Sequence, residues 1–205
     1  MNPEQSAWDR DYRLRGRLWG GSKRPIPDLP AGSRVLELGC GNGKTLSAML
    51  HQPWQTAALD ISCRAAEIAM SDSNGCADIL VADARRLPFK DGSFDAVLAF
   101  HVTGHLLSEG RGLIASESAR VLRQGGRLFF RDFGAEDMRF GQGREVEPQT
   151  YERGEGILTH YFTEQETIEL FSMLRPESVR SHAWNMRIRG QDLIRSEIEA
   201  CLARD

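Results

Sequence analysis

The sequence lacks a long apolar run and carries little net charge. No apolar run is long enough to cross a membrane, and the N-terminus does not have the pattern of a cleavable signal. We therefore expect a cytoplasmic protein without membrane segments. A formal charge of -3 gives the chain as a whole no attraction for nucleic acid. Its 205 residues suit one domain with a sizeable core.

Cysteine pairs and metal-ligand patterns are also missing. The four cysteines are scattered along the chain: Cys40, Cys63, Cys76 and Cys201. Without a C-x-x-C pair, neither a disulfide framework nor a zinc site is favoured. His101 and His105 are four residues apart, but no H-E-x-x-H pattern accompanies them. The sequence therefore predicts no metal site.

The most informative stretch is a glycine-rich loop that follows a short apolar run. The run ends at Glu37-Leu38, glycines follow at 39, 41 and 43, and apolar residues then recur at helical spacing. This order predicts a strand, a tight turn and a helix start, where backbone N–H groups converge on a ligand. Glycine suits these positions because a side chain would block close backbone approach or disfavour positive φ.

Three ligands compete for this loop, beside the plain alternative of a connection that binds nothing. A dinucleotide site needs G-x-G-x-x-G, but Lys44 stands in place of the third glycine. A P-loop needs G-x-x-x-x-G-K-[ST], but Leu38 stands where its first glycine belongs. A nucleoside triphosphatase is therefore the least favoured of the functions considered. The pattern Glu37-x-Gly39-x-Gly41-x-Gly43 closely resembles the first motif of class I S-adenosylmethionine (SAM)-dependent methyltransferases.

Two acidic residues follow at the spacing of a nucleoside site. Asp60 ends a predicted strand over 55–60, where an acid accepts the ribose hydroxyls in nucleoside-binding folds. Asp83 follows a predicted strand over 78–82, and the resemblance implies that it receives the adenine amine. The stretch 87–95 matches the family's LPF…DGSFD passage and leads into a predicted strand over 94–100. The resemblance implies these cofactor-binding residues: Glu37, Gly39, Cys40, Gly41, Asn42, Gly43, Asp60, Ile61, Asp83, Ala84 and Phe100.

Strands that alternate with helices predict an α/β fold. We expect a mostly parallel sheet with helices on both faces. The resemblance to class I methyltransferases implies that this sheet is Rossmann-like and seven-stranded, with an antiparallel last strand. The later predicted elements are a helix over 111–123, a strand over 127–130, a hairpin of 150–153 with 157–162, a capped helix from Thr163 to Leu174 and a strand over 177–189. The apolar spacing over 192–204 fits a helix as well as a strand, and the resemblance favours the last strand there. Residues 1–30 are predicted to form a helical cap and 31–205 the SAM-dependent methyltransferase domain.

The last third of the chain is similar to the 3-methylcytidine tRNA methyltransferases. Its Phe130-Arg131-Asp132-Phe133-Gly134 stretch and the residues that follow resemble their F-R-D-Y-G…D-M…R-F…Y-F-F-T series. This likeness implies acceptor-side roles for Arg131, Asp132, Arg139, Arg153 and Tyr161. His101 follows the predicted strand over 94–100, where a histidine can orient or deprotonate a substrate or serve only the structure.

These observations predict an enzyme that transfers a methyl group from SAM to an acceptor and leaves S-adenosylhomocysteine. The acceptor is either a tRNA nucleobase or a small molecule, and an inactive SAM-binding scaffold is the alternative. Acidic residues outnumber basic ones after residue 130, which is unusual for an RNA-binding enzyme. A protein partner could supply a basic surface, and a homodimer is left open.

Overall fold

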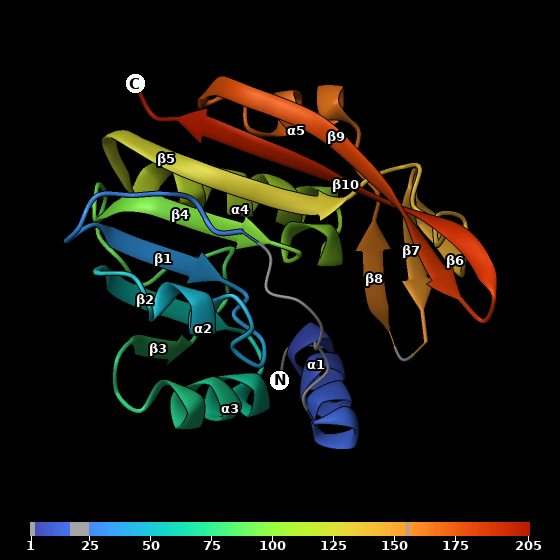
Figure 1. Ribbon diagram of the computed structural model, residues 1–205, viewed down its shortest axis with the longest axis horizontal. Coiled ribbons are helices and arrows are strands. Elements are labelled where there is room, and N and C mark those ends of the chain that lie inside the picture. Colours follow the sequence, from blue (N-terminus) through green and yellow to red (C-terminus); the bar gives the residue numbers. More distant parts are fainter. Residues whose placement is uncertain (1–2, 17–24, 155) are drawn as a thin grey trace.

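The computed structural model describes residues 3–16, 25–154 and 156–205 (Figure 1). The helices are α1 (Pro3–Arg15), α2 (Leu46–Met49), α3 (Cys63–Ser73), α4 (Ser108–Val121) and α5 (Glu164–Leu170), with a short 3₁₀ turn, η1 (Thr103–His105). The strands are β1 (Arg34–Leu38), β2 (Gln55–Asp60), β3 (Asp78–Val81), β4 (Phe94–Phe100), β5 (Leu122–Phe133), β6 (Arg144–Glu147), β7 (Thr150–Arg153), β8 (Ile157–His160), β9 (Arg175–Ile188) and β10 (Gln191–Ala203). Within the described residues, no helix is long and apolar enough to span a membrane.

The central sheet has seven strands in the order β3-β2-β1-β4-β5-β10-β9. Strands β3, β2, β1, β4 and β5 are parallel, whereas β10 pairs antiparallel with both β5 and β9. The predicted fold class is therefore confirmed, including the antiparallel last strand. The order reverses between β1 and β4, so a crevice opens at the carboxyl ends of these neighbouring strands.

Both faces of the sheet are buried, because alternate residues of each strand enter different clusters. Leu36, Val97 and Leu128 belong to the cluster that contains Ile114 of α4. Val35 and Leu98 belong to a second cluster, with Met49 of α2. Figure 1 shows α2 in front of the sheet and α4 behind it. Continuous apolar strands are typical of a parallel sheet covered on both sides.

Several predicted boundaries are wrong by a few residues. The helix predicted over 111–123 is α4, which begins at Ser108 and ends at Val121. Leu122 is already extended, and β5 begins there rather than at Arg127. The Arg204 guanidinium donates hydrogen bonds to the carbonyls of Ala119 and Arg120, both at 2.8 Å, and so satisfies the end of the helix.

The N-terminal caps of α3 and α5 differ. The Ser62 hydroxyl accepts the Ala65 N–H at 3.1 Å, as an N-cap of α3. Thr163 likewise accepts the Glu166 N–H at 3.2 Å. The Glu166 carboxylate, however, contacts His160 Nε2 at 2.7 Å instead of completing a capping box. Helix α5 also ends at Leu170 and does not reach the predicted Leu174.

The β9–β10 hairpin is long and continues past the end of β5 toward a second sheet (Figure 1). Its turn uses Arg189 and Gly190, both with positive φ, which suits the twist of a two-residue hairpin. The second sheet has the order β6-β7-β8, so the predicted hairpin of 150–153 and 157–162 is confirmed and gains β6.

Helix α1 occupies part of the segment predicted as a cap, residues 1–30. Trp8 and Tyr12 contact each other on α1 with ring centroids 6.2 Å apart, as their spacing predicts. The remainder of the predicted cap at residues 1–2 and 17–24 lies outside the described residues.

Candidate active site

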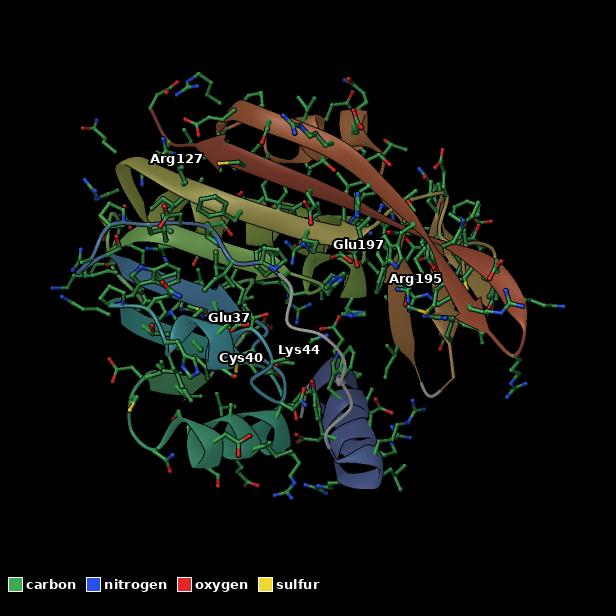
Figure 2. All side chains as sticks on the ribbon, viewed as in Figure 1. Glu37, Cys40, Lys44, Arg127, Arg195 and Glu197 are labelled. Carbon is green, nitrogen blue, oxygen red and sulfur yellow. The ribbon has the colours of Figure 1, made fainter. Side chains whose placement is uncertain are left out.

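A cavity of about 460 Å³ opens at the point where the strand order reverses. Its size falls within the range of about 300–1,000 Å³ that is usual for small-molecule sites. Residues that follow β1, β2 and β3 line one end, and residues that follow β4 and β5 or belong to β9 and β10 line the other. In Figure 2, Glu37, Cys40 and Lys44 lie at the first end, and Glu197 lies across from them on β10. We call these two parts the loop end and the acceptor end.

The glycine loop turns sharply because three of its glycines adopt positive φ. The values are 66° at Gly39, 53° at Gly41 and 80° at Gly43. A Cβ on Gly39 would lie 2.7 Å from Val102 Cγ2, so the segment after β4 also requires a glycine there. The Gly41 N–H donates to Asp60 at 2.8 Å, which ties the loop to the end of β2.

Asp60 lies in the cavity wall with each carboxylate oxygen held by a backbone donor. One oxygen accepts the Gly41 N–H at 2.8 Å, and the other accepts the Ser62 N–H at 2.9 Å. Burial raises the pKa of Asp60 to about 6, despite these two hydrogen bonds. Each carboxylate oxygen can accept more than one hydrogen bond, so Asp60 can also accept hydroxyl donors from a ligand.

Glu37 is a second buried acid at the loop end. Burial raises its pKa from 4.5 to about 8, with a further rise from the nearby Asp60, while a hydrogen bond with Thr45 acts in the opposite direction. Its Oε2 atom is buried, and the described residues include no hydrogen-bond partner for it. A buried acid of this kind is stabilised in its ionised form by a cation. The loop end therefore suits a ligand with positive charge and hydroxyl groups.

Asp83 and Ala84 also line the cavity, but Arg85 engages the Asp83 carboxylate. Arg85 Nε and Nη2 contact it at 2.9 and 2.7 Å. Burial acts to raise the pKa of Asp83, but these contacts outweigh it and hold the pKa below its usual value. The Arg85 guanidinium also pairs with Glu4 of α1 at 2.7 Å, so α1 is fastened to this part of the wall.

A second contact fastens α1 beside Asp60. The Ser62 hydroxyl donates to Asp9 at 2.6 Å, and the Arg64 N–H donates to the same oxygen at 3.1 Å. Trp8 packs against His105 with ring centroids 4.8 Å apart, and both residues line the cavity. Helix α1 therefore forms part of the cavity wall.

His101 lies between two carboxylates at the acceptor end. It follows β4 with φ 53°, a left-handed conformation uncommon for residues other than glycine. Its Nδ1 lies 3.8 Å from Asp132 Oδ1, and its Nε2 lies 3.5 Å from Glu197 Oε1. The ring also packs against Phe133 with centroids 4.7 Å apart.

Asp132 lies behind His101, and Arg131 and Phe133 on either side of it line the cavity. The Asp132 carboxylate accepts the Gly104 N–H at 2.8 Å and the Phe133 N–H at 3.0 Å. Burial acts to raise the pKa of Asp132, but His101, His105 and the Gly104 N–H lower it below its usual value. The Asp132 carboxylate is therefore ionised, and it lies close to the His101 ring.

The arginines at the acceptor end contact carboxylates and aromatic rings. Arg139 and Arg195 contact Asp137 at 2.8 and 2.7 Å, and both guanidinium groups lie over the Phe133 ring. These contacts outweigh burial and lower the pKa of Asp137. Arg131 contacts Glu199 at 2.8 Å and lies over the ring of Phe100.

Most residues predicted from sequence meet at this cavity. The residues that line it are Glu37, Gly39, Cys40, Gly41, Asn42, Asp60, Ile61, Asp83, Ala84, Phe100, His101, Arg131 and Arg139. Four predicted residues are not part of the described wall: Gly43, Asp132, Arg153 and Tyr161. Gly43 shapes the turn, and Tyr161 is buried in a cluster with Phe133 and Tyr151.

Sequence reasoning missed the part of the wall that comes from the β9–β10 hairpin. Trp184, Met186, Arg195 and Glu197 line the acceptor end. Residues two apart on a strand point to the same face of a hairpin, so the sequence groups these side chains on one face. The spacing does not tell whether that face meets the crevice. Among the described residues, no group of three or more His, Cys, Asp and Glu residues could hold a metal ion.

Comparison with known proteins adds the following findings. Residues 36–130 match the family described as a methyltransferase domain. The chain is 32% identical over 187 residues to the tRNA N(3)-methylcytidine methyltransferase Mettl2 of Drosophila melanogaster. The alignment covers 78% of this chain and 57% of that protein. The chain thus spans little more than half the length of this curated relative.

Solved structures share the fold at low sequence identity. A SAM-dependent methyltransferase from Methanosarcina mazei aligns with a TM-score of 0.71 and 22% identity, over 86% of this chain and 94% of that one. A complex between the Haloferax volcanii Trm112 methyltransferase activator and a methyltransferase aligns with a TM-score of 0.69 and 19% identity, over 97% of this chain and 90% of that one.

Proposed function

Since the chain carries a methyltransferase domain with the class I fold, we propose that it transfers the methyl group of SAM to an acceptor in the same cavity. SAM supplies a methyl group already activated by a positively charged sulfur atom. The chain has to bind it, exclude water and hold a nucleophile in line with the methyl group. The name of the Drosophila relative favours a nucleobase of tRNA as the acceptor.

One observation carries the cofactor assignment: two buried acids converge on the glycine loop. Asp60 offers carboxylate oxygens to the two ribose hydroxyls, and the buried Oε2 of Glu37 offers negative charge to the cationic methionine part of SAM. Asp83 and Ala84 follow at the position expected for adenine. A nucleoside triphosphate fits less well, because its phosphates would approach these buried carboxylates.

The acceptor end supports a flat, polar ring as the acceptor. His101 and Phe133 present two closely packed, tilted rings there, and Arg131 and Arg139 lie at the wall. We assign acceptor contacts to His101 and Arg131 and a positioning role to Asp132, which acts through His101. The relative named as a tRNA N(3)-methylcytidine methyltransferase spans most of this chain and supports a cytidine acceptor.

Helix α1 is proposed to form a cap over the cofactor, within the segment 1–30. It is tied to the loop end at Ser62 and Arg85, each two residues beyond a proposed nucleoside-binding acid. Residues 31–205 then form the catalytic domain.

Mass spectrometry of digested tRNA tests the proposal. Purified protein is incubated with SAM that carries a deuterated methyl group and with unmodified tRNA, alone and together with a Trm112-type activator, because a structural neighbour forms such a complex. We expect the label in N3-methylcytidine. Label only in added small-molecule extracts would favour a metabolite methyltransferase, and SAM binding without transfer to any pool would favour a scaffold.

A further inference from the structure

A second histidine of the cavity wall, His105, lies in the 3₁₀ turn η1. It follows β4 and so belongs to the acceptor end. The preceding residue, Gly104, donates its N–H to the Asp132 carboxylate at 2.8 Å, which holds the turn beside the end of β5. On another side, the Trp8 ring of α1 packs crosswise on the His105 ring, with centroids 4.8 Å apart. The position of His105 is therefore fixed from both β5 and α1.

A third contact determines which nitrogen of the His105 ring carries a proton. Nδ1 lies 2.7 Å from the carbonyl oxygen of Leu158 on β8. A carbonyl oxygen can only accept a hydrogen bond, so Nδ1 is the donor of this bond. In a neutral imidazole the other nitrogen, Nε2, then has no proton and is a hydrogen-bond acceptor.

Burial favours the neutral form of this ring. It lowers the pKa of His105 below the ordinary value of 6.5, and the opposing effects of Asp132 and of the bond to Leu158 are smaller. The side chain is nevertheless half-buried and lines the cavity, so a ligand can reach it. In the described part of the chain, the hydrogen bond of the His105 ring is the one at Nδ1. The acceptor end thus contains a neutral acceptor nitrogen whose partner can come from a ligand.

An acceptor nitrogen with a fixed proton on the other side of its ring discriminates between the pyrimidine bases. Cytosine carries an amino group next to its N3 atom, whereas a carbonyl oxygen takes that place in uracil. The amino group can donate to Nε2, and this contact leaves the N3 lone pair open to the methyl group. A carbonyl oxygen would bring two acceptors together. Nε2 cannot become a donor in the neutral ring, because Leu158 holds the proton at Nδ1.

We infer that His105 Nε2 accepts a hydrogen bond from the amino group of the target base and so selects a base with an amino group beside its nucleophilic nitrogen. This inference rests on the proposed function and adds to it the residue that chooses the acceptor. The adenine of SAM also carries an amino group, but its proposed contacts are Asp83 and Ala84, which follow β3 at the loop end.

Two substitutions separate the roles of the two ring nitrogens. In His105→Asn the amide N–H can take the place of Nδ1 and keep the bond to Leu158, but nothing replaces Nε2. In His105→Gln the amide oxygen can take the place of Nε2, whereas the bond to Leu158 is lost. His51→Asn is the control, since His51 is exposed between α2 and β2 and lies outside the cavity wall.

Binding of nucleotides in the presence of S-adenosylhomocysteine gives a readout that does not need turnover. The probes are cytidine monophosphate, uridine monophosphate and the 2-pyrimidinone analogue, in which hydrogen replaces the amino group. The wild-type protein should bind cytidine monophosphate roughly fivefold more tightly than either of the others. His105→Asn should lose this preference, whereas His105→Gln and His51→Asn should keep it. His105→Gln should instead have the lower melting temperature, because it loses the bond to Leu158.

Three results would overturn the assignment. One is equal affinity of the wild-type protein for the three nucleotides, or no binding of any of them. Another is a preference that persists in His105→Asn but is lost in His105→Gln, which would show that the ring only supports β8. The third is weaker binding of S-adenosylhomocysteine by His105→Asn, which would place Nε2 at the adenine of the cofactor.

The two proposals fail in different ways. Label in uridine, or on a molecule without an amino group, would leave the methyltransferase proposal standing and overturn the role of His105. No transfer to any acceptor would overturn the proposed function, whereas the nucleotide preference would still decide whether His105 recognises an amino group.

Discussion

Replacement of Glu37 by glutamine should stabilise the ligand-free protein at alkaline pH and weaken its binding of SAM. The folded protein holds the Glu37 proton to a pKa of about 8, compared with 4.5 for an exposed glutamate. Below pH 4.5 both states are protonated. Between pH 4.5 and 8 the folded state binds more protons, so the free energy of unfolding falls as pH rises.

The size of this effect follows from the two pKa values. Each tenfold change in the ionisation constant corresponds to about 1.4 kcal/mol, so a pKa raised from 4.5 to about 8 gives a loss of roughly 5 kcal/mol above pH 8. Glu37→Gln removes this loss but keeps a side chain of nearly the same shape. At pH 8.5 the variant should unfold at a higher urea concentration than the wild type, and at pH 4.5 the difference should disappear.

Binding of the cofactor should shift Glu37 from its protonated form to its ionised form. Binding of cationic SAM favours the ionised form of Glu37, so about one proton should be released per SAM bound at pH 7. Calorimetry in buffers of different ionisation enthalpy measures this release, which Glu37→Gln should abolish together with part of the affinity. Glu109→Gln, at an exposed position in the first turn of α4, is the control. Identical pH dependence of unfolding in the wild type and Glu37→Gln would refute the reasoning.

Three further predictions concern other parts of the cavity. Asp60→Ala should weaken SAM binding by about 1–3 kcal/mol, because a buried acceptor is lost, and an unchanged dissociation constant by calorimetry would contradict its ribose role. Gly39→Ala should lower the melting temperature, at a cost of about 1–3 kcal/mol, because its Cβ would lie 2.7 Å from Val102 Cγ2 and 2.9 Å from Val102 Cβ; a second change, Val102→Gly, removes both atoms and should restore part of that loss, and additive losses would argue against the clash. Asp132→Asn should reduce turnover with little effect on SAM affinity, because it loosens His101; loss of SAM binding instead would place Asp132 in the cofactor site.

Sequence reasoning predicted the parallel half of the sheet well because local signals were strong there. Gly39, Gly41 and Gly43 indicated the turn, and all three adopt positive φ. Asp60 was predicted at the end of the second strand, and it is the last residue of β2. Local chain order predicts such elements, because a parallel strand followed by a loop and a helix leaves few topologies.

The acceptor end was predicted less well because it depends on long-range pairing. Glu197 reaches the cavity through the register of β10 with β5, which pairs it with Phe133, and no local pattern near residue 197 indicates that register. Arg153 and Tyr161 were assigned from resemblance alone, and the structure places Arg153 on β7 and Tyr161 in an aromatic cluster. The start of β5 at Leu122 was also missed, because the preceding helix was predicted to continue to residue 123.

Titration of the purified protein with SAM and with S-adenosylhomocysteine in a calorimeter tests the central claim most directly. Two buried acids beside a glycine loop should bind both nucleosides at one site per chain, and Asp60→Ala should weaken both. No heat with either compound, together with clear binding of ATP, would contradict the account.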